Sequence, residues 1–260
     1  DGDGLTFSIV DNPSNGSLGS IGTVTCVGSP STCTADVNYT PDANSNGSDS
    51  FTFKANDGTQ DSNTATVDIT VDAVNDAPSF TSGGNVNVNE DSGAYSAAWA
   101  TGMSAGPSDE SGQTLSFNIT GNNNPSLFSV APSIAPDGTL SFTLADNANG
   151  TASLSVTLQD NGGTANSGVD TSAPVNFDII VTGVNDGPVN TVPAAQNVNE
   201  DTDLVFSSGN GNALSTADID AAPGDVQVTV SALNGTITPI ASGAIITNSG
   251  TSSATITGTL

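Results

Sequence analysis

The stretch VNDAP at residues 74–78 returns 110 residues later as VNDGP at residues 184–188. A second phrase keeps the same spacing, because VNVNED at residues 86–91 reappears as QNVNED at residues 196–201. Two motifs that share one period indicate tandem domains rather than chance. Both motifs fall at the predicted domain joints and carry carboxylates, so the sequence places the function at those joints.

Outward from these motifs, the chain consists of short runs in which apolar and polar residues alternate. Gly, Asn, Asp and Pro interrupt the runs about every eight to twelve residues, which is the spacing of an all-β sandwich. No stretch keeps a helical period. Strands are predicted at residues 5–9, 51–53, 67–71, 115–119, 140–144, 154–158, 226–230 and 254–257.

The charge of the chain excludes several classes of function. It has 27 acidic residues, no Arg and no His, and Lys54 is its one basic side chain, so the formal charge is −26. Such a chain has no basic surface for nucleic acid or for anionic lipid head groups. Clustered carboxylates without cations repel one another. Bound divalent cations relieve that repulsion, and Ca²⁺ is favoured because the available ligands are oxygens.

The two cysteines, Cys26 and Cys33, are too few for a zinc or iron–sulfur site in a chain without His. A disulfide that closes a hairpin is the preferred interpretation, with two free thiols as the alternative. No signal peptide, transmembrane run or lipidation motif occurs. The chain opens in mid-pattern, which suggests internal domains of a longer protein.

Further phrases carry a resemblance to a known family. The chain resembles the bacterial cadherin-like (VCBS-like) tandem repeats of giant secreted adhesins. The resemblance implies tandem Ig/cadherin-like β-sandwiches arranged as an elongated rod. It divides the chain into residues 1–76, a complete repeat at 77–186, and residues 187–260, the outer two lacking terminal strands. The phrases that carry it are residues 1–7, 39–44, 47–51, 74–78, 88–91, 160–163, 184–188, 200–201 and 218–220.

The resemblance also implies a Ca²⁺ cluster at each joint. In cadherin-type joints, ligands come from an acidic residue near the start of one domain, an Asn-Asp linker, and an Asp-x-Asp pair in the next domain. The second joint would accordingly use Glu90, Asn185, Asp186, Asp218 and Asp220. The first joint would use Asn75, Asp76, Asp109 and Glu110, where Asp-Glu replaces Asp-x-Asp. The alternative is that Asn-Asp near Pro is only linker chemistry.

Two other acidic phrases have competing interpretations. Residues 42–47 mimic the first half of an EF-hand loop, but Phe53 stands where the bidentate Glu belongs, so a β-turn is expected. Asp57-Gly58 and Asp160-Asn161-Gly162-Gly163 follow strands late in their repeats. Both are expected to be turns whose Asp side chains could add a ligand at a domain end.

Catalysis has little support in the sequence. Without His, a Ser–His–Asp triad is impossible. A glycosidase carboxylate pair is compatible with the composition, yet two of the three glutamates, Glu90 and Glu200, repeat with the domains. Repetition is typical of structural sites, so the chain is not expected to be an enzyme. A carbohydrate-binding module would need an aromatic platform, and Trp99, Tyr39 and Tyr95 are scattered.

The sequence therefore predicts a segment of an extracellular or cell-surface bacterial adhesin or fibre, stiffened by Ca²⁺ at its joints. Its expected partners are neighbouring repeats or identical subunits, and a cell-surface or glycan target bound by regions outside this chain. The alternative is a filament subunit that polymerises head to tail, with strands of one copy completing an open sandwich of the next.

Overall fold

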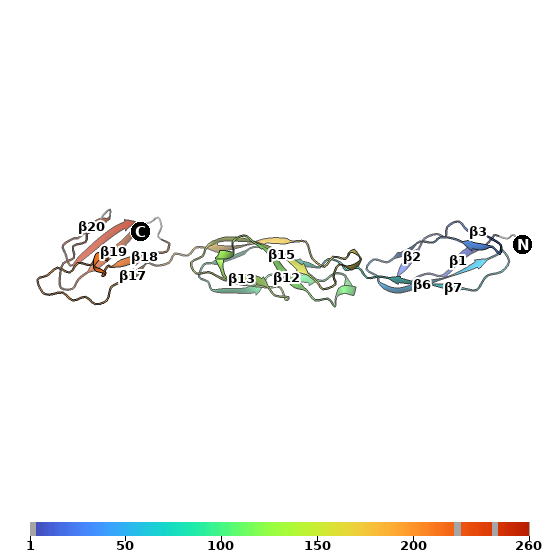
Figure 1. The fold of residues 1–260 in the computed structure, drawn as a ribbon, viewed down its shortest axis with the longest axis horizontal. Helices are drawn as coiled ribbons and strands as arrows, with labels where there is room; N and C mark the ends of the chain where they lie inside the picture. Colours follow the sequence, from blue (N-terminus) through green and yellow to red (C-terminus); the bar gives the residue numbers. More distant parts are fainter. Residues whose placement is uncertain (1–3, 221–224, 241–243, 260) are drawn as a thin grey trace. The chain divides into compact units, whose positions relative to one another are not determined.

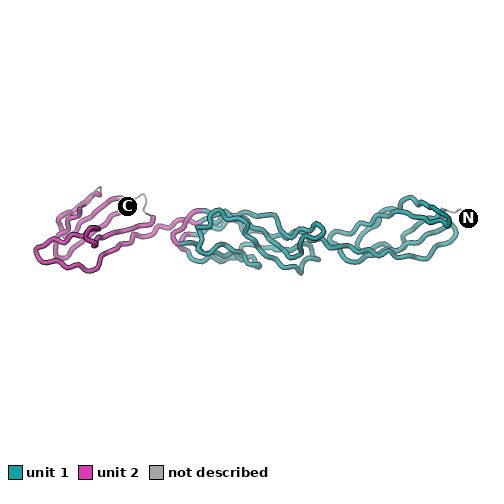
Figure 2. Tube along the Cα trace, viewed as in Figure 1, with its two compact units in different colours: residues 1–88, 92–145, 151–180 teal, residues 89–91, 146–150, 181–260 magenta. Residues whose placement is uncertain are grey.

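The computed structural model describes residues 4–220, 225–240 and 244–259, which form an all-β protein (Figure 1). Its helical turns in this part of the chain are four short 3-10 segments. The chain divides into two compact units (Figure 2). One comprises residues 1–88, 92–145 and 151–180, and the other residues 89–91, 146–150 and 181–260. The division into three repeats stays a prediction, and residues 1–3 of its opening phrase lie outside the described part.

The N-terminal repeat (residues 4–76) is built on a three-stranded antiparallel sheet. Its order is β1 (Thr6–Asp11), β6 (Gly47–Asn56) and β7 (Ala65–Val71). The inward side chains of β7 alternate with exposed ones, as the period of two requires. Two short pairs complete the repeat: β2 (Gly16–Leu18) with β5 (Tyr39–Pro41), and β3 (Thr25–Val27) with β4 (Thr32–Thr34).

The predicted disulfide is present on the β3–β4 hairpin. Cys26 and Cys33 lie directly opposite each other in this pair and are bonded. The expected β-turn at residues 42–47 is also present, since Ser45 N–H donates to the Asp42 carbonyl at 3.2 Å. Phe53 lies within β6, so this phrase forms a turn and not an EF-hand loop.

The central repeat (residues 77–186) has the larger core. One sheet has the order β12 (Ser116–Asn122), β15 (Gly150–Gln159), β16 (Val175–Thr182) and β9 (Val86–Asn89). A second has the order β10 (Ala94–Ala98), β14 (Thr139–Leu144) and β13 (Phe128–Ile134). A short pair joins β11 (Thr101–Ser104) to β8 (Ser79–Thr81).

Aromatic side chains from the start of the central repeat fill its core. Trp99 lies 4.3 Å from Phe177 between ring centroids, and Phe80 makes an edge-to-face contact with Phe117 at 5.2 Å. Trp99 and Phe177 are only 4% and 3% exposed. The segment preceding β12 therefore supplies core side chains, Phe80 from β8 and Trp99 from the turn between β10 and β11. Among the described residues, the largest fully buried side chains are Leu127, Leu140, Leu154, Val156, Leu158 and Ile179.

The C-terminal repeat (residues 187–259, as described) has two small sheets. In one, β17 (Val189–Thr191) pairs with β18 (Ser215–Ala217). In the other, β21 (Ser253–Thr259) lies between β19 (Asp225–Ser231) and β20 (Ile245–Thr247). Many of its large apolar side chains remain exposed, among them Val192, Val198, Val205, Phe206 and Leu214.

The remaining regular elements are the 3-10 segments. They are η1 (Ser108–Glu110), η2 (Pro125–Leu127), η3 (Ala165–Ser167) and η4 (Ser208–Asn210). In the described ranges no helix is long and apolar enough to cross a membrane. Of these segments, η1 matters most for function, because it carries two of the predicted ligands.

Candidate metal centre

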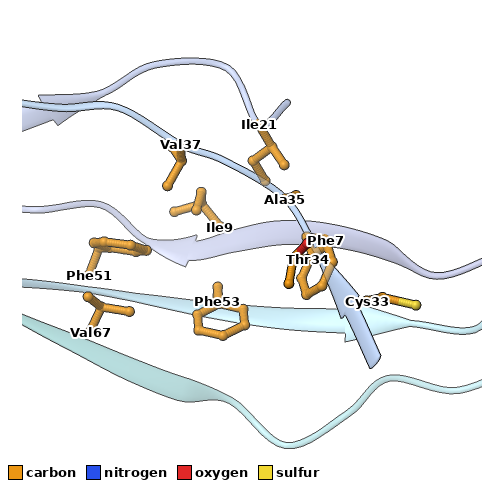
Figure 3. A pocket seen from close by; sticks show the side chains of 10 residues that line it. All are labelled: Phe7, Ile9, Ile21, Cys33, Thr34, Ala35, Val37, Phe51, Phe53 and Val67. Atoms are coloured by element: carbon orange, nitrogen blue, oxygen red, sulfur yellow. The ribbon is translucent and has the colours of Figure 1, made fainter. Parts of the chain in front are cut away.

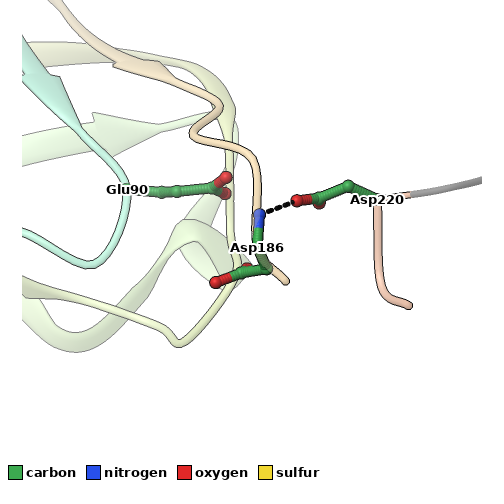
Figure 4. A group of neighbouring side chains, drawn as sticks. All are labelled: Glu90, Asp186 and Asp220. Carbon is green, nitrogen blue, oxygen red and sulfur yellow. Dashed lines mark hydrogen bonds between the residues drawn. The ribbon is translucent and has the colours of Figure 1, made fainter. Parts of the chain in front are cut away.

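Three carboxylates from distant parts of the sequence meet in the C-terminal unit. Ligand oxygens of Glu90, Asp186 and Asp220 lie within 4.8 Å of one another (Figure 4). Glu90 directly follows β9, Asp186 follows β16, and Asp220 comes three residues after β18. We call these three residues the C-terminal cluster. The structure thus brings together three of the five ligands predicted for the second joint.

Glu90 is held rigidly by its surroundings. It is 3% exposed, and its backbone N–H donates to the Thr182 carbonyl at 2.9 Å. Its Oε1 accepts from the Val184 N–H at 2.6 Å, and its Oε2 accepts from Asn149 Nδ2 at 3.1 Å. Each oxygen therefore has one donor and keeps further acceptor capacity for a cation.

Asp186 faces acidic neighbours instead of donors. Its backbone N–H donates to Asp220 Oδ2, but its own Oδ2 is buried without a partner among the described residues. Burial raises the pKa of the Asp186 carboxyl, and the nearby charges of Asp91, Asp220, Glu90 and Asp218 raise it further. A buried acceptor facing other carboxylates is a favourable position for a cation ligand.

The other two predicted ligands of this joint make hydrogen bonds next to the cluster, and their role as ligands stays a prediction. Asp218 Oδ1 accepts from the Asp220 N–H at 3.1 Å, so it orients the loop that presents Asp220. The Asn185 amide donates to the Asp186 carbonyl at 2.7 Å. Asn185 is therefore part of the linker's own hydrogen bonding, whereas Asp218 lies beside the cluster.

A second cluster lies in the N-terminal unit, at the predicted first joint. The Asp76 N–H donates to Glu110 Oε1 at 2.8 Å. This bond spans 34 residues, as does the bond from Asp186 to Asp220. Glu110 thus occupies the place of Asp220, and Ser108 is the counterpart of Asp218 in the 110-residue period. We call Asn75, Asp76, Glu110, Gln113 and Asp160 the Asn75 cluster.

Asn75 is the centre of this second cluster. Its amide donates to Asp160 Oδ1 at 3.0 Å and to the Val169 carbonyl at 2.7 Å, and its Oδ1 accepts from Gln113 Nε2 at 2.7 Å. Gly162 is required here, because a Cβ at this position would overlap Asn75 Oδ1. The predicted linker residue is therefore fixed from three sides.

Several polar atoms of the Asn75 cluster are buried and unpaired within the described part of the chain. They are Glu110 Oε2, Asp160 Oδ2 and Gln113 Oε1. Glu110 and Asp160 are only 7% and 6% exposed, and a hollow of about 210 Å³ is lined in part by Glu110 and Gln113. Unpaired buried oxygens beside a hollow fit a bound cation or water. The remaining predicted ligand, Asp109, accepts from Asn46 Nδ2 at 2.9 Å.

Four residues near the clusters were missing from the predicted ligand sets. Asp160 follows β15, in the turn that was expected at a domain end. Asp91 is the second acid of the repeated Glu-Asp phrase, and the sequence analysis gives it no role as a ligand. Gln113 and Asn149 lie in loops without a periodic counterpart of the same type, so no sequence signal pointed to them.

The comparisons with known proteins agree with the sheets described above. Residues 1–70 match the family model of the bacterial Ig domain. The match and the observed sheets confirm the predicted fold class of tandem Ig/cadherin-like β-sandwiches and, at this level, the predicted resemblance. The arrangement as an elongated rod stays a prediction. The chain matches no curated protein in sequence.

Solved structures with similar folds include human protocadherin-24 EC1-2, with 16% identity and a TM-score of 0.45 over 69% of this chain and 82% of that chain. Mouse cadherin-23 EC22-24 has 16% identity and a TM-score of 0.45 over 98% of this chain and 76% of that chain. An endo-fucoidan hydrolase from glycoside hydrolase family 107 has 20% identity and a TM-score of 0.29, over 70% of this chain and 24% of that chain.

Proposed function

We propose that this chain is a structural segment of an extracellular bacterial adhesin or surface fibre, stiffened by Ca²⁺ bound at its joints. The observation that carries the proposal is the C-terminal cluster, where three carboxylates converge without a basic side chain. Lys54, the one cation of the sequence, is paired with Asp61 at 2.6 Å. A divalent cation is the simplest source of the missing positive charge.

The donors of the cluster fit calcium chemistry. Ca²⁺ takes six to eight oxygens from carboxylates, carbonyls and water in a flexible geometry. Glu90, Asp186 and Asp220 would bind it, with Asp218 beside them as a further acid. These ligands come from three separate segments, at residues 90, 186 and 218–220. A shared ion would tie those segments together and remove their freedom to move apart, which is the proposed stiffening.

The remaining parts of the proposal follow from composition. A disulfide and a bacterial Ig-type N-terminal segment favour an extracellular or cell-surface location. No catalytic role is proposed, since a chain without His or Arg cannot form a Ser–His–Asp triad, and its repeated acids are assigned to structural sites. Adhesion itself would belong to regions of the polypeptide outside this chain.

Differential scanning calorimetry and calcium titration test the proposal. A ligand that binds only the folded state adds about 2.7 kcal/mol at a hundredfold excess over its Kd. Calcium should therefore raise the melting temperature of the unit that contains residues 181–260, and a chelator should reverse the rise. Asp220→Asn should weaken calcium binding, whereas Asp203→Asn, an equal charge change at an exposed position of the same unit, should not. A melting temperature that changes with neither calcium nor chelator would refute the proposed function.

A further inference from the structure

The disulfide of the N-terminal repeat lies on a hairpin that the central repeat lacks. The long strands β6 and β15 each follow a hairpin of the same kind. In one of these hairpins Gly16 pairs with Pro41, and in the other Phe128 pairs with Leu144. The span from Gly16 to Pro41 is the longer of the two. Its additional residues contain the β3–β4 pair, which carries Cys26 and Cys33.

The central repeat shows which part of this hairpin belongs to the sandwich. There, β10 pairs with residues 139–143 of β14. Counted back from the starts of β15 and β6, these residues correspond to residues 36–40 of the N-terminal repeat. A strand placed beside residues 36–40 in the manner of β10 would reach neither β3 nor β4. The β3–β4 pair is thus an addition to the sandwich, outside the strands that the two repeats share.

The disulfide on this added hairpin is accessible to solvent. Among the described residues, β3 and β4 pair only with each other. Cys26 is exposed and Cys33 is half-buried. The Cys33 sulfur points away from the apolar side chains of Ile9, Phe51 and Val67 (Figure 3). Exposed disulfides are open to attack by thiols, whereas structural disulfides in general resist reduction.

The two sulfurs differ in their contacts. Ser31 Oγ lies 4.0 Å from Cys33 Sγ, and a disulfide sulfur carries no proton, so the Ser31 hydroxyl is the donor. A thiolate released at Cys33 would keep this donor, and a hydrogen bond to a charged group stabilises the charged form. Exchange is faster when the leaving thiolate is the more stable one. Attack is therefore expected at Cys26, with Cys33 as the leaving group.

Charge selects which thiols reach the hairpin. Residues 25–34 contain no Asp, Glu or Lys, whereas the chain as a whole carries a formal charge of −26. An acid, Asp36, lies just beyond the hairpin and is exposed. The field of such a protein repels anionic reagents and attracts cationic ones. A thiol with an amine is therefore favoured over a thiol with carboxylates.

We propose that the Cys26–Cys33 disulfide is a modification site for small thiols that carry an amine. The thiolate of such a molecule attacks Cys26 Sγ and forms a mixed disulfide. The Cys26–Cys33 bond breaks, and its electron pair leaves with Cys33 Sγ, which takes a proton from water. The incoming thiol is oxidised and Cys33 is reduced, so the electrons balance. The β1–β6–β7 sheet keeps its pairing, because neither β3 nor β4 belongs to it.

Peptide mapping of the native full chain tests the site of attack. The chain is treated with cysteamine in the presence of chelator, and released thiols are capped with iodoacetamide before digestion. We expect the cysteamine adduct at Cys26 and the cap at Cys33, in about tenfold excess over the reverse arrangement. Ser31→Ala should slow the reaction about threefold and reduce this excess. Ser29→Ala makes the same change in the same turn and should alter neither.

Two further measurements test the selection by charge and the independence of the main sheet. At equal thiolate concentrations cysteamine should react faster than glutathione, and the ratio of the two rates should fall as added salt screens the charge of the chain. Hydrogen exchange of residues 47–56 should be the same before and after modification. An adduct mainly at Cys33, a reaction that occurs only in denaturant, a rate ratio that does not respond to salt, or loss of protection in β6 would overturn the proposal.

Discussion

The two acidic clusters share a backbone arrangement but differ in what surrounds the carboxylates. In both, the linker Asp donates its N–H to an acid 34 residues later. In the C-terminal cluster burial raises the pKa of Asp186, and its neighbours are further acids that raise it more. In the Asn75 cluster, Asn75 and Gln113 supply amide groups, and Ser108 stands where the other has Asp218. The Asn75 cluster contains three acids, whereas Asp186 and the four acids around it make five. A shared backbone arrangement with fewer acids predicts a weaker calcium site at the first joint.

The largest expected effect comes from removing the buried acid of the C-terminal cluster. Glu90→Ala leaves the Val184 N–H and Asn149 Nδ2 without their acceptor. Hydrogen bonds to a charged group contribute about 1.5–3 kcal/mol each, but Val184 and Asn149 are exposed residues whose donors water can reach, so we expect a loss of about 2 kcal/mol in the free energy of unfolding of that unit. Relief of repulsion from Asp186 is smaller, because Asp186 is half-exposed. Urea unfolding in chelator, followed by far-ultraviolet circular dichroism, measures the loss.

The repeat provides the control for this variant. Glu200 is the counterpart of Glu90, but it is exposed, so Glu200→Ala should change stability by less than about 0.5 kcal/mol. Equal losses in the two variants would show that position in the repeat, and not the contacts of Glu90, determines the effect.

An exchange of side chains between the clusters tests whether the number of acids determines the difference in their calcium affinity. Asp218→Ser should weaken calcium binding at the C-terminal cluster, and Ser108→Asp should strengthen it at the Asn75 cluster. Ligand charge tunes the affinity of such sites, and we expect about a tenfold change, or about 1.4 kcal/mol, in opposite directions. Isothermal titration calorimetry measures both. Ser111→Asp adds the same charge at an exposed position nearby and should have little effect.

The smallest expected effect is the pH dependence of stability caused by Asp49, whose carboxylate is held only by hydrogen-bond donors. Burial would raise the pKa of Asp49, but hydrogen bonds from the Ser14 N–H, the Tyr39 hydroxyl, and the Ser50 and Asn15 N–H groups outweigh it and lower the pKa to about 2. A lowered folded-state pKa gives stability that is present above the unfolded value of 3.8 and is lost as the pH falls toward 2.

Unfolding curves between pH 4 and 2 test this prediction. Asp49→Asn should flatten the loss of stability across that range, and calcium should leave the slope unchanged, because the donors already occupy both Asp49 oxygens. A variant with the same slope as the unchanged chain would mean that other acids cause the loss.

The sequence predicted the repeated parts of the molecule better than the unrepeated parts. Alternation located every strand named from the sequence, because a half-buried strand imposes a period of two. The 110-residue period located Glu90 and Asp186. The same period pairs Ser108 with Asp218. The ligand set predicted for the first joint instead used Asp109 together with Glu110. Asp109 accepts from Asn46 Nδ2 and lines the same hollow as Glu110, so its role as a ligand stays a prediction.

The contacts that could not be predicted from the sequence are made by residues in loops. Asn149 and Gln113 reach the clusters from turns whose path depends on the packing of whole sheets. The Asn185 amide donates to the Asp186 carbonyl, although other hydrogen-bond acceptors compete for it locally. The repeat period does not predict which acceptor it uses. The ligand sets predicted for the joints otherwise stay predictions until calcium binding is measured.

The position of Lys54 determines how the chain can be cut by proteases that cleave after basic residues. Enzymes that cleave after basic residues have a single target bond in these 260 residues. That bond lies inside β6, the middle strand of its sheet, with the lysine side chain held by Asp61. A protease cannot accommodate a strand that remains paired on both sides, so cutting requires local opening. The rate of trypsin cleavage therefore reports directly on how often the N-terminal sheet comes apart, in a molecule that offers the enzyme no other site.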